Sequence, residues 1–171
     1  LFSKPGSTDS VESLKRVLFT GEYTIHCNAH PSNRNGTAQG PVIGGNLSLV
    51  VDSLGTSSEP DTSSCILVVE EIDEYKYRLD RMLTQLKRAG KLSNLNGLVV
   101  GHITDIKDSE LPFGISLERI ILDAVGQYHY PVAFGFPSGH QNPNLAWIHG
   151  GTATLNVSKE KTVMFSTSLP V

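Results

Sequence analysis

Two side chains that could move protons follow aliphatic runs of the sequence. Glu70 comes directly after residues 66–69, and His140 lies in a Pro-Ser-Gly-His loop that follows residues 132–136. The carboxyl ends of strands in an α/β sheet meet at one edge, where ligands gather. A carboxylate that orients an imidazole is the acid and base half of a nucleophilic triad. A strand-end glutamate and a Gly-His turn also occur without any catalytic role, so spacing alone leaves both interpretations open.

A nucleophile for this pair is missing from the sequence. The G-x-S-x-G turn that exposes a serine in many hydrolases does not occur. Ser48 and Ser53 fall within a predicted helix. Ser138 is two residues from His140, too close along the loop to present its hydroxyl to that ring. If a serine completes the pair, we expect another domain to carry it.

The elements that must position Glu70 and His140 follow from hydrophobic periodicity. Continuous aliphatic runs predict buried strands at 66–69, 98–103 and 132–136. Apolar stripes of helical period predict helices between them, at 77–89 and from Ser116 onward. This alternation indicates an α/β fold with parallel pairings. The remaining predicted elements are a helix from Asp9 or Ser10 to Gly21, a strand at 23–27, a loop at 30–45, a helix from about Asn46, and a hairpin of 147–157 with 162–165.

Composition places limits on the partners. The 171 residues carry a formal net charge of -3 without a run of Lys or Arg, so we expect no nucleic acid. No apolar stretch approaches the roughly 20 residues that span a bilayer, so we expect no membrane insertion. The two cysteines are too few for a disulfide framework, which favours a reducing compartment. His26, Cys27 and His30 lack the fourth ligand of a usual zinc site, and we expect no metal there.

Five blocks of the chain resemble the LD-carboxypeptidases of murein recycling. They occur in the order and with the spacing of that family, and they span roughly residues 40–157. The blocks are GGNLSL at 44–49, ILVVEE at 66–71, YRLDRMLTQL at 77–86, PSGH at 137–140 and PNLA at 143–146. The resemblance identifies residues 9–171 as the C-terminal domain of such an enzyme, with residues 1–8 as the remnant of a linker.

This resemblance implies a fold and a reaction. The domain should be a swivelling β/β/α unit with a mixed, partly barrel-like sheet flanked by helices. Glu70 and His140 should be the catalytic acid and base, and the serine should lie on an N-terminal domain that this chain lacks. The reaction would remove the terminal D-alanine from murein tetrapeptides in the cytoplasm, without a cofactor or a metal. The partners expected are that N-terminal domain, the murein peptide and a second copy in a homodimer, and the chain alone should be inactive.

Four further residues are candidates for substrate contacts. Gly45 and Asn46 open a helix, whose free amides attract anions. His102 ends the strand at 98–103 and could line the same cleft as Glu70, although such a histidine is more often structural. Arg81 could hold a terminal carboxylate through two parallel hydrogen bonds, although an ion pair on the helix surface is the more common role.

Three other functions are compatible with these residues. The chain could be a non-catalytic module that binds cell-wall peptides, or part of an immunity enzyme that hydrolyses acyl-adenylate antibiotics. It could also be a structural lid, in which case Glu70 and His140 should point apart. The resemblance of residues 77–86 favours the murein branch over the immunity branch.

Overall fold

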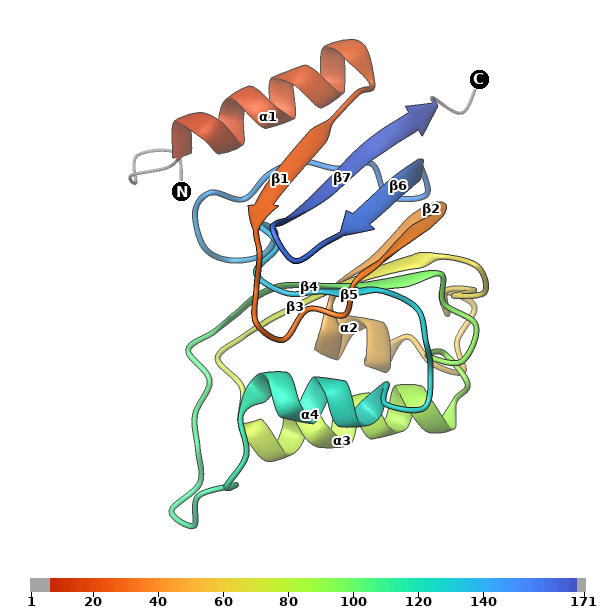
Figure 1. Cartoon of the computed structure of the whole chain (residues 1–171). Coiled ribbons are helices and arrows are strands. Elements are labelled where there is room, and N and C mark those ends of the chain that lie inside the picture. The colour runs from red at the N-terminus through yellow and green to blue at the C-terminus, as the bar shows by residue number, and fades with distance from the viewer. Residues whose placement is uncertain (1–6, 169–171) are drawn as a thin grey trace.

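The computed structural model describes residues 7–168, which form one seven-stranded sheet and four helices (Figure 1). The strand order is β1-β7-β6-β2-β3-β4-β5. The strands are β1 (Thr24–Asn28), β2 (Gly36–Asn46), β3 (Ile66–Ile72), β4 (Gly97–Thr104), β5 (Val132–Ala133), β6 (Thr152–Val157) and β7 (Lys161–Ser168). The helices are α1 (Ser7–Thr20), α2 (Leu47–Asp52), α3 (Lys76–Arg88) and α4 (Leu117–Ala124).

The half of the sheet from β2 to β5 is parallel, as the sequence predicted. Helices α2, α3 and α4 cover the same side of this half (Figure 1). Both faces of β3 and β4 are buried, which explains their continuous aliphatic runs. The apolar stripes of the two long helices pack on this sheet through Leu79, Leu83, Leu86, Ile120 and Ile121.

The other half of the sheet is antiparallel. Strands β6 and β7 form the predicted hairpin, and β1 pairs with β7 at the edge. A second core lies on the face away from α3 and α4, and it includes Ile25, Phe136, Leu155 and Met164. Mixed pairing confirms the predicted fold class, and the sheet stays open between its edge strands β1 and β5.

Strand β2 corrects the prediction of a loop at residues 30–45. It lies at the centre of the sheet and joins the two halves, because residues 36–41 pair with β6 and residues 42–46 pair with β3. Its glycines, which suggested a loop, are required because the neighbouring backbone lies too close to leave room for a Cβ. A Cβ at Gly44 would lie 2.0 Å from the carbonyl oxygen of Val68, and one at Gly40 would lie 2.4 Å from that of Ser64. Pro41 stands where β2 changes partner, so its missing N–H interrupts neither half.

Helix α1 begins at Ser7, so residues 7 and 8 are helical and only residues 1–6 of the expected linker lie outside the described residues. It ends as predicted at Gly21, whose N–H donates to the carbonyl of Val17. The predicted apolar stripe is less buried than expected, because Leu18 is 71% exposed. Helix α1 lies beside β1, on the opposite side of the molecule from α3 and α4 (Figure 1).

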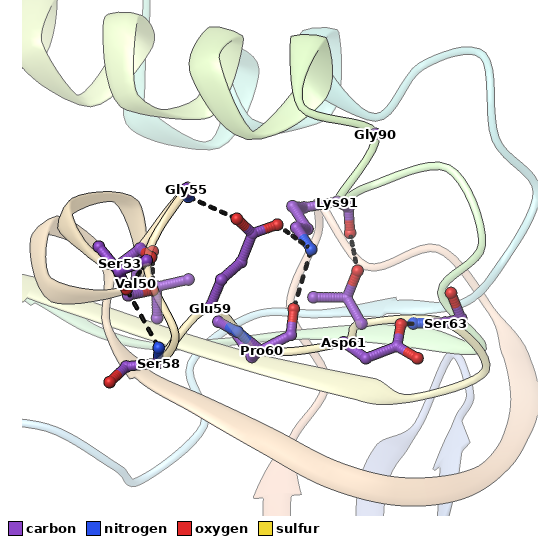
Figure 2. Close-up of polar contacts among 12 residues, drawn as sticks. Val50, Ser53, Gly55, Ser58, Glu59, Pro60, Asp61, Ser63, Gly90 and Lys91 are labelled. Atoms are coloured by element: carbon purple, nitrogen blue, oxygen red, sulfur yellow. Dashed lines mark hydrogen bonds and ion pairs between the residues drawn. The ribbon is translucent and has the colours of Figure 1, made fainter.

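The connection from α2 to β3 is held by Lys91, which follows α3 (Figure 2). Its ammonium lies 2.5 Å from the carboxylate of Glu59 and donates to the carbonyl of Pro60 at 3.0 Å. The hydroxyl of Thr62 donates to the carbonyl of Lys91 at 2.8 Å. These bonds fix the chain just before β3, the strand that carries Glu70.

Two further observations concern membrane-spanning helices and disulfides. Within residues 7–168, every helix is too short or too polar to traverse a bilayer. Both cysteines are free thiols, and Cys65 is buried at the start of β3.

Candidate active site

Glu70 and His140 lie within hydrogen-bonding distance of each other. The Nδ1 atom of His140 is 2.8 Å from Oε2 of Glu70. Because a carboxylate only accepts hydrogen bonds, Nδ1 carries the proton, and Nε2 is then the acceptor nitrogen of a neutral ring. Glu70 is buried, whereas the side chain of His140 is 49% exposed. The pair therefore has a fixed inner end and an accessible outer end.

Alternation along β3 separates Glu70 from its acidic neighbour. Val69 packs in the core under α3 and α4, whereas Val68 packs in the opposite core with Phe136. Glu70 follows Val68 in this alternation and so turns toward the loop after Phe136. Glu71 turns the other way and is also buried.

The buried carboxylate of Glu71 has a structural role. It accepts hydrogen bonds from Nδ2 of Asn46 at 2.8 Å and from the N–H groups of Ser48 at 2.9 Å and Ile72 at 3.0 Å. A carboxylate so fully occupied ties the start of α2 to the end of β3. Of the two adjacent acids, only Glu70 contacts an imidazole.

The loop that carries His140 continues beside β4 after β5 ends. The N–H of Phe136 donates to the carbonyl of Val100 at 3.1 Å, and the N–H of His102 donates to the carbonyl of Ser138 at 2.7 Å. Gly139 has φ +130°, which L side chains rarely adopt. A Cβ there would lie 3.0 Å from Oε2 of Glu70. Gly139 thus allows the loop to close over the glutamate and bring His140 against it.

Asn46 and Gly45 lie at the end of β2, next to β3. The side chain of Asn46 is already engaged, because Oδ1 accepts from the N–H of Leu49 and caps α2 while Nδ2 donates to Glu71. Gly45 pairs with Val69, and a Cβ on it would meet no atom within 4 Å. Gly45 therefore borders open space, in a pocket that it lines with Leu49 and His149 and that includes neither Glu70 nor His140, whereas Asn46 serves the local structure.

His102 lies beside the pair. A Cβ at Gly139 would be 3.1 Å from that of His102 and 3.2 Å from that of Glu70. Nδ1 of His102 is buried without a hydrogen-bond partner among the described residues, and burial lowers the pKa of the ring. The residue also lines a pocket of about 230 Å³ between β4 and α4 that reaches Gln141.

Arg81 is exposed on α3. Its guanidinium carbon lies 5.9 Å from the centroid of the Tyr77 ring. The ion pairs found within residues 7–168 do not include Arg81, so the ion pair expected on the helix surface is not formed. The structure thus places His102 beside the pair, whereas Asn46 is bonded to Glu71 and Gly45 borders a separate pocket. Arg81 contacts an aromatic ring instead.

Residues 26–30 do not assemble a metal site. No three His, Cys, Asp or Glu side chains anywhere in residues 7–168 are grouped so that they could hold a metal ion. The ring of His30 stacks on Phe134 with centroids 5.4 Å apart. Burial raises the pKa of the Cys27 thiol to about 12, so it stays protonated and is a poor ligand.

A contact between two residues near His140 was missed from the sequence. The indole N–H of Trp147 donates to the hydroxyl of Ser138 at 3.1 Å, and Ser138 is buried. Trp147 was predicted to begin a strand, but β6 starts only at Thr152. The sequence feature that could have indicated this contact is the single tryptophan of the chain, which lies seven residues after His140 in a loop rich in Pro and Asn.

Comparison with known proteins identifies relatives of this chain. Residues 39–155 match the family model described as LD-carboxypeptidase C-terminal domain, and this match includes both Glu70 and His140. A Bacillus subtilis protein named a probable murein peptide carboxypeptidase is 37% identical over 129 residues. That alignment covers 75% of this chain but only 40% of the relative.

Two solved structures share the fold. A muramoyltetrapeptide carboxypeptidase from Oxalobacter formigenes has a TM-score of 0.88 and 28% identity, and the match covers 96% of this chain and 56% of that one. The microcin C7 self immunity protein MccF has a TM-score of 0.79 and 17% identity, with the same coverage of both chains. At that identity the second comparison concerns the fold alone.

Proposed function

This chain belongs to the LD-carboxypeptidase family, and we propose that it supplies the acid and the base of a serine carboxypeptidase acting on murein tetrapeptides. The observation that carries the proposal is the 2.8 Å contact between Nδ1 of His140 and Oε2 of Glu70. The lid hypothesis required these side chains to point apart, and they do not. A binding module would have no need for a buried carboxylate that orients an accessible imidazole.

In the proposed mechanism His140 is the general base. Its Nε2 takes the proton from a serine hydroxyl as the oxygen attacks the carbonyl carbon of the peptide bond. Glu70 holds the ring in the tautomer with Nδ1 protonated and stabilises the imidazolium that forms. His140 then gives the proton to the departing amine of D-alanine. Water, activated by the same imidazole, hydrolyses the acyl-serine and regenerates the pair.

The proposed serine comes from outside this chain. The chain spans about 40% of the length of its Bacillus relative and 56% of the Oxalobacter chain. Within the described residues the serine nearest the ring along the chain, Ser138, is buried and bonded to Trp147. We therefore propose that an N-terminal domain docks against the exposed edge of His140, and that the 171-residue chain alone does not turn over substrate.

The substrate we propose is a murein peptide that ends in D-alanine. The name of the Bacillus relative supports this class, and that relative is far more similar to this chain than the immunity protein is. His102, which lies beside the pair, and Gly45, which borders open space at the end of β2, are proposed to contact the peptide. Asn46 is proposed to act through the start of α2, and Arg81 is proposed as an outer contact for a carboxylate.

The experiment is a comparison of two substrates with the full-length protein. A murein tetrapeptide and an aminoacyl sulfamoyl adenosine are each incubated with the protein, and the products are identified by mass spectrometry. We expect release of D-alanine from the tetrapeptide and little cleavage of the nucleotide. Preferential cleavage of the nucleotide would favour the immunity function, and tight binding of the peptide without cleavage would favour the binding module.

Two further parts of the proposal concern the whole protein. We propose that it works in the cytoplasm, where tetrapeptides are recycled, and that it forms a homodimer. Light scattering of the full-length protein would give its mass in solution. Cell fractionation would show whether it is found with cytoplasmic or with exported proteins.

A further inference from the structure

The segment 142–147, here called the return segment, runs back along the loop that carries His140. It makes three hydrogen bonds to that loop. The amide oxygen of Asn144 accepts from the N–H of Gly139 at 3.2 Å, and the N–H of Leu145 donates to the carbonyl of Pro137 at 2.8 Å. The third is the bond from the indole of Trp147 to the hydroxyl of Ser138 at 3.1 Å. Every residue from 137 to 139 thus has a partner in the return segment.

Helix α1 holds the return segment from the other side. The hydroxyl of Ser10 accepts from the N–H of Asn144 at 2.9 Å, and that of Ser13 accepts from the N–H of Ala146 at 2.9 Å. The two serines are three residues apart and lie on one face of the helix. The two amides are two residues apart, and the N–H of Leu145 between them donates instead to the carbonyl of Pro137. The helix therefore satisfies amides that would otherwise need a neighbouring strand.

Ser138 is the point at which these restraints meet. Its carbonyl accepts from the N–H of His102 on β4, and its hydroxyl accepts from Trp147. Trp147 is itself half-buried against the core that contains Phe136. Ser138 is thus held from two directions, two residues before the ring that must meet Glu70.

We infer that Trp147 is a positioning residue for His140, acting through Ser138, and this inference rests on the proposed function. With this side-chain tether removed, Ser138 is held by backbone bonds alone. It can then rotate about the bond from His102, within the limits left by the bonds of Pro137 and Gly139 to the return segment. A rotation there moves His140, whose half-exposed ring is not enclosed by a core. Displacing a catalytic group by about 1 Å can cost about 100-fold in rate. Loss of the Trp147 bond should therefore lower turnover without removing any group that touches substrate.

The test compares Trp147→Phe, Ser138→Ala and the control Tyr130→Phe in the full-length protein. The control also removes one half-buried aromatic hydrogen bond, from Tyr130 to the carbonyl of Leu92 at 3.0 Å, but away from His140. We expect kcat for D-alanine release to fall about 10- to 100-fold in the first two variants, with KM within about twofold. The double variant should fall no further than either single one, because both remove the same bond.

A second measurement does not depend on activity. The Nδ1–H of His140, bonded to Glu70, is expected as a slowly exchanging ring proton in the NMR spectrum, absent from His140→Ala. It should exchange faster in Trp147→Phe and Ser138→Ala than in Tyr130→Phe. A wild type without peptidase activity would refute the proposed function, and this signal would still test the positioning.

The inference is overturned if Trp147→Phe and Ser138→Ala match Tyr130→Phe in both kcat and ring-proton exchange. It is also overturned if KM rises while kcat is unchanged, since Trp147 would then be a binding residue. Should Trp147→Phe fail to fold, Ser138→Ala decides alone, because that change leaves the indole packed in place.

Discussion

Replacing Gly139 by alanine tests how closely the His140 loop must approach Glu70. The added Cβ would lie 3.0 Å from Oε2 of Glu70, 3.2 Å from its Cβ and 3.1 Å from the Cβ of His102. These neighbours lie at the ends of β3 and β4 and cannot withdraw easily, so the loop must lift by a few tenths of an ångström. Alanine at φ +130° adds backbone strain of about 1–3 kcal/mol.

Lifting the loop lengthens the contact of 2.8 Å between Nδ1 of His140 and Oε2 of Glu70. A lift of that size lengthens it to about 3.2 Å, the upper end of ordinary hydrogen-bond distances. We expect kcat to fall by about 10-fold, because this shift is smaller than the displacement of about 1 Å that can cost about 100-fold. The free energy of unfolding should fall by no more than the backbone strain, because the loop can lift while both cores stay packed.

The assay is D-alanine release by the full-length protein, with urea unfolding of each variant. Gly114→Ala is the matched control, because Gly114 has φ +81° and a Cβ there would meet no atom within 4 Å. It carries backbone strain without crowding Glu70. If Gly139→Ala retained the kcat of Gly114→Ala, the close approach of loop and glutamate would have no part in catalysis.

Two further predictions concern ionisable groups. Burial lowers the pKa of His102. The unfolded chain therefore binds a proton at this residue below about pH 6.5, whereas the folded chain binds it only at a lower pH. This contribution to stability is present above that pH and is lost as the pH falls through the folded pKa. The fall in urea midpoint from pH 7.5 to 5.5 should therefore be smaller in His102→Gln than in the wild type. An equal fall in both would contradict a lowered pKa at His102. Burial raises the pKa of Cys27 to about 12 and also raises that of Cys65. Both thiols should therefore react with a disulfide reagent at pH 8 at least about 100-fold more slowly in the native chain than in urea, and rapid labelling of the native chain would show that they are accessible.

The sequence predicted best those elements whose residues are buried by a regular pattern. Strands β3 and β4 are continuous aliphatic runs because both faces are covered, and α3 and α4 carry clear apolar stripes. Strand β2 was missed because its glycines are required by the carbonyls of Ser64 and Val68. That requirement comes from strands that are distant in sequence, and no local pattern shows it.

The candidate site was predictable in a similar way. The pairing of Glu70 with His140 was expected from strand ends and family resemblance, and the two side chains do lie together. The contact between Trp147 and Ser138 was not predicted, because it depends on how the return segment folds back. The difference between Glu70 and Glu71 follows from alternation along β3, which a sequence shows only once the strand's faces are known.

The measurement that tests the central claim most directly compares Glu70→Gln with Glu71→Gln in the full-length protein. The two changes are the same, in adjacent buried residues, but Glu70 contacts His140 whereas Glu71 accepts three N–H groups. In Glu70→Gln we expect kcat for D-alanine release to fall by about 10⁴-fold, the loss seen in a serine protease whose triad aspartate was changed to asparagine. In Glu71→Gln we expect kcat per folded molecule to be kept and the free energy of unfolding to fall by about 2–3 kcal/mol. Near-normal turnover in Glu70→Gln, or equal losses of turnover in both variants, would contradict the account.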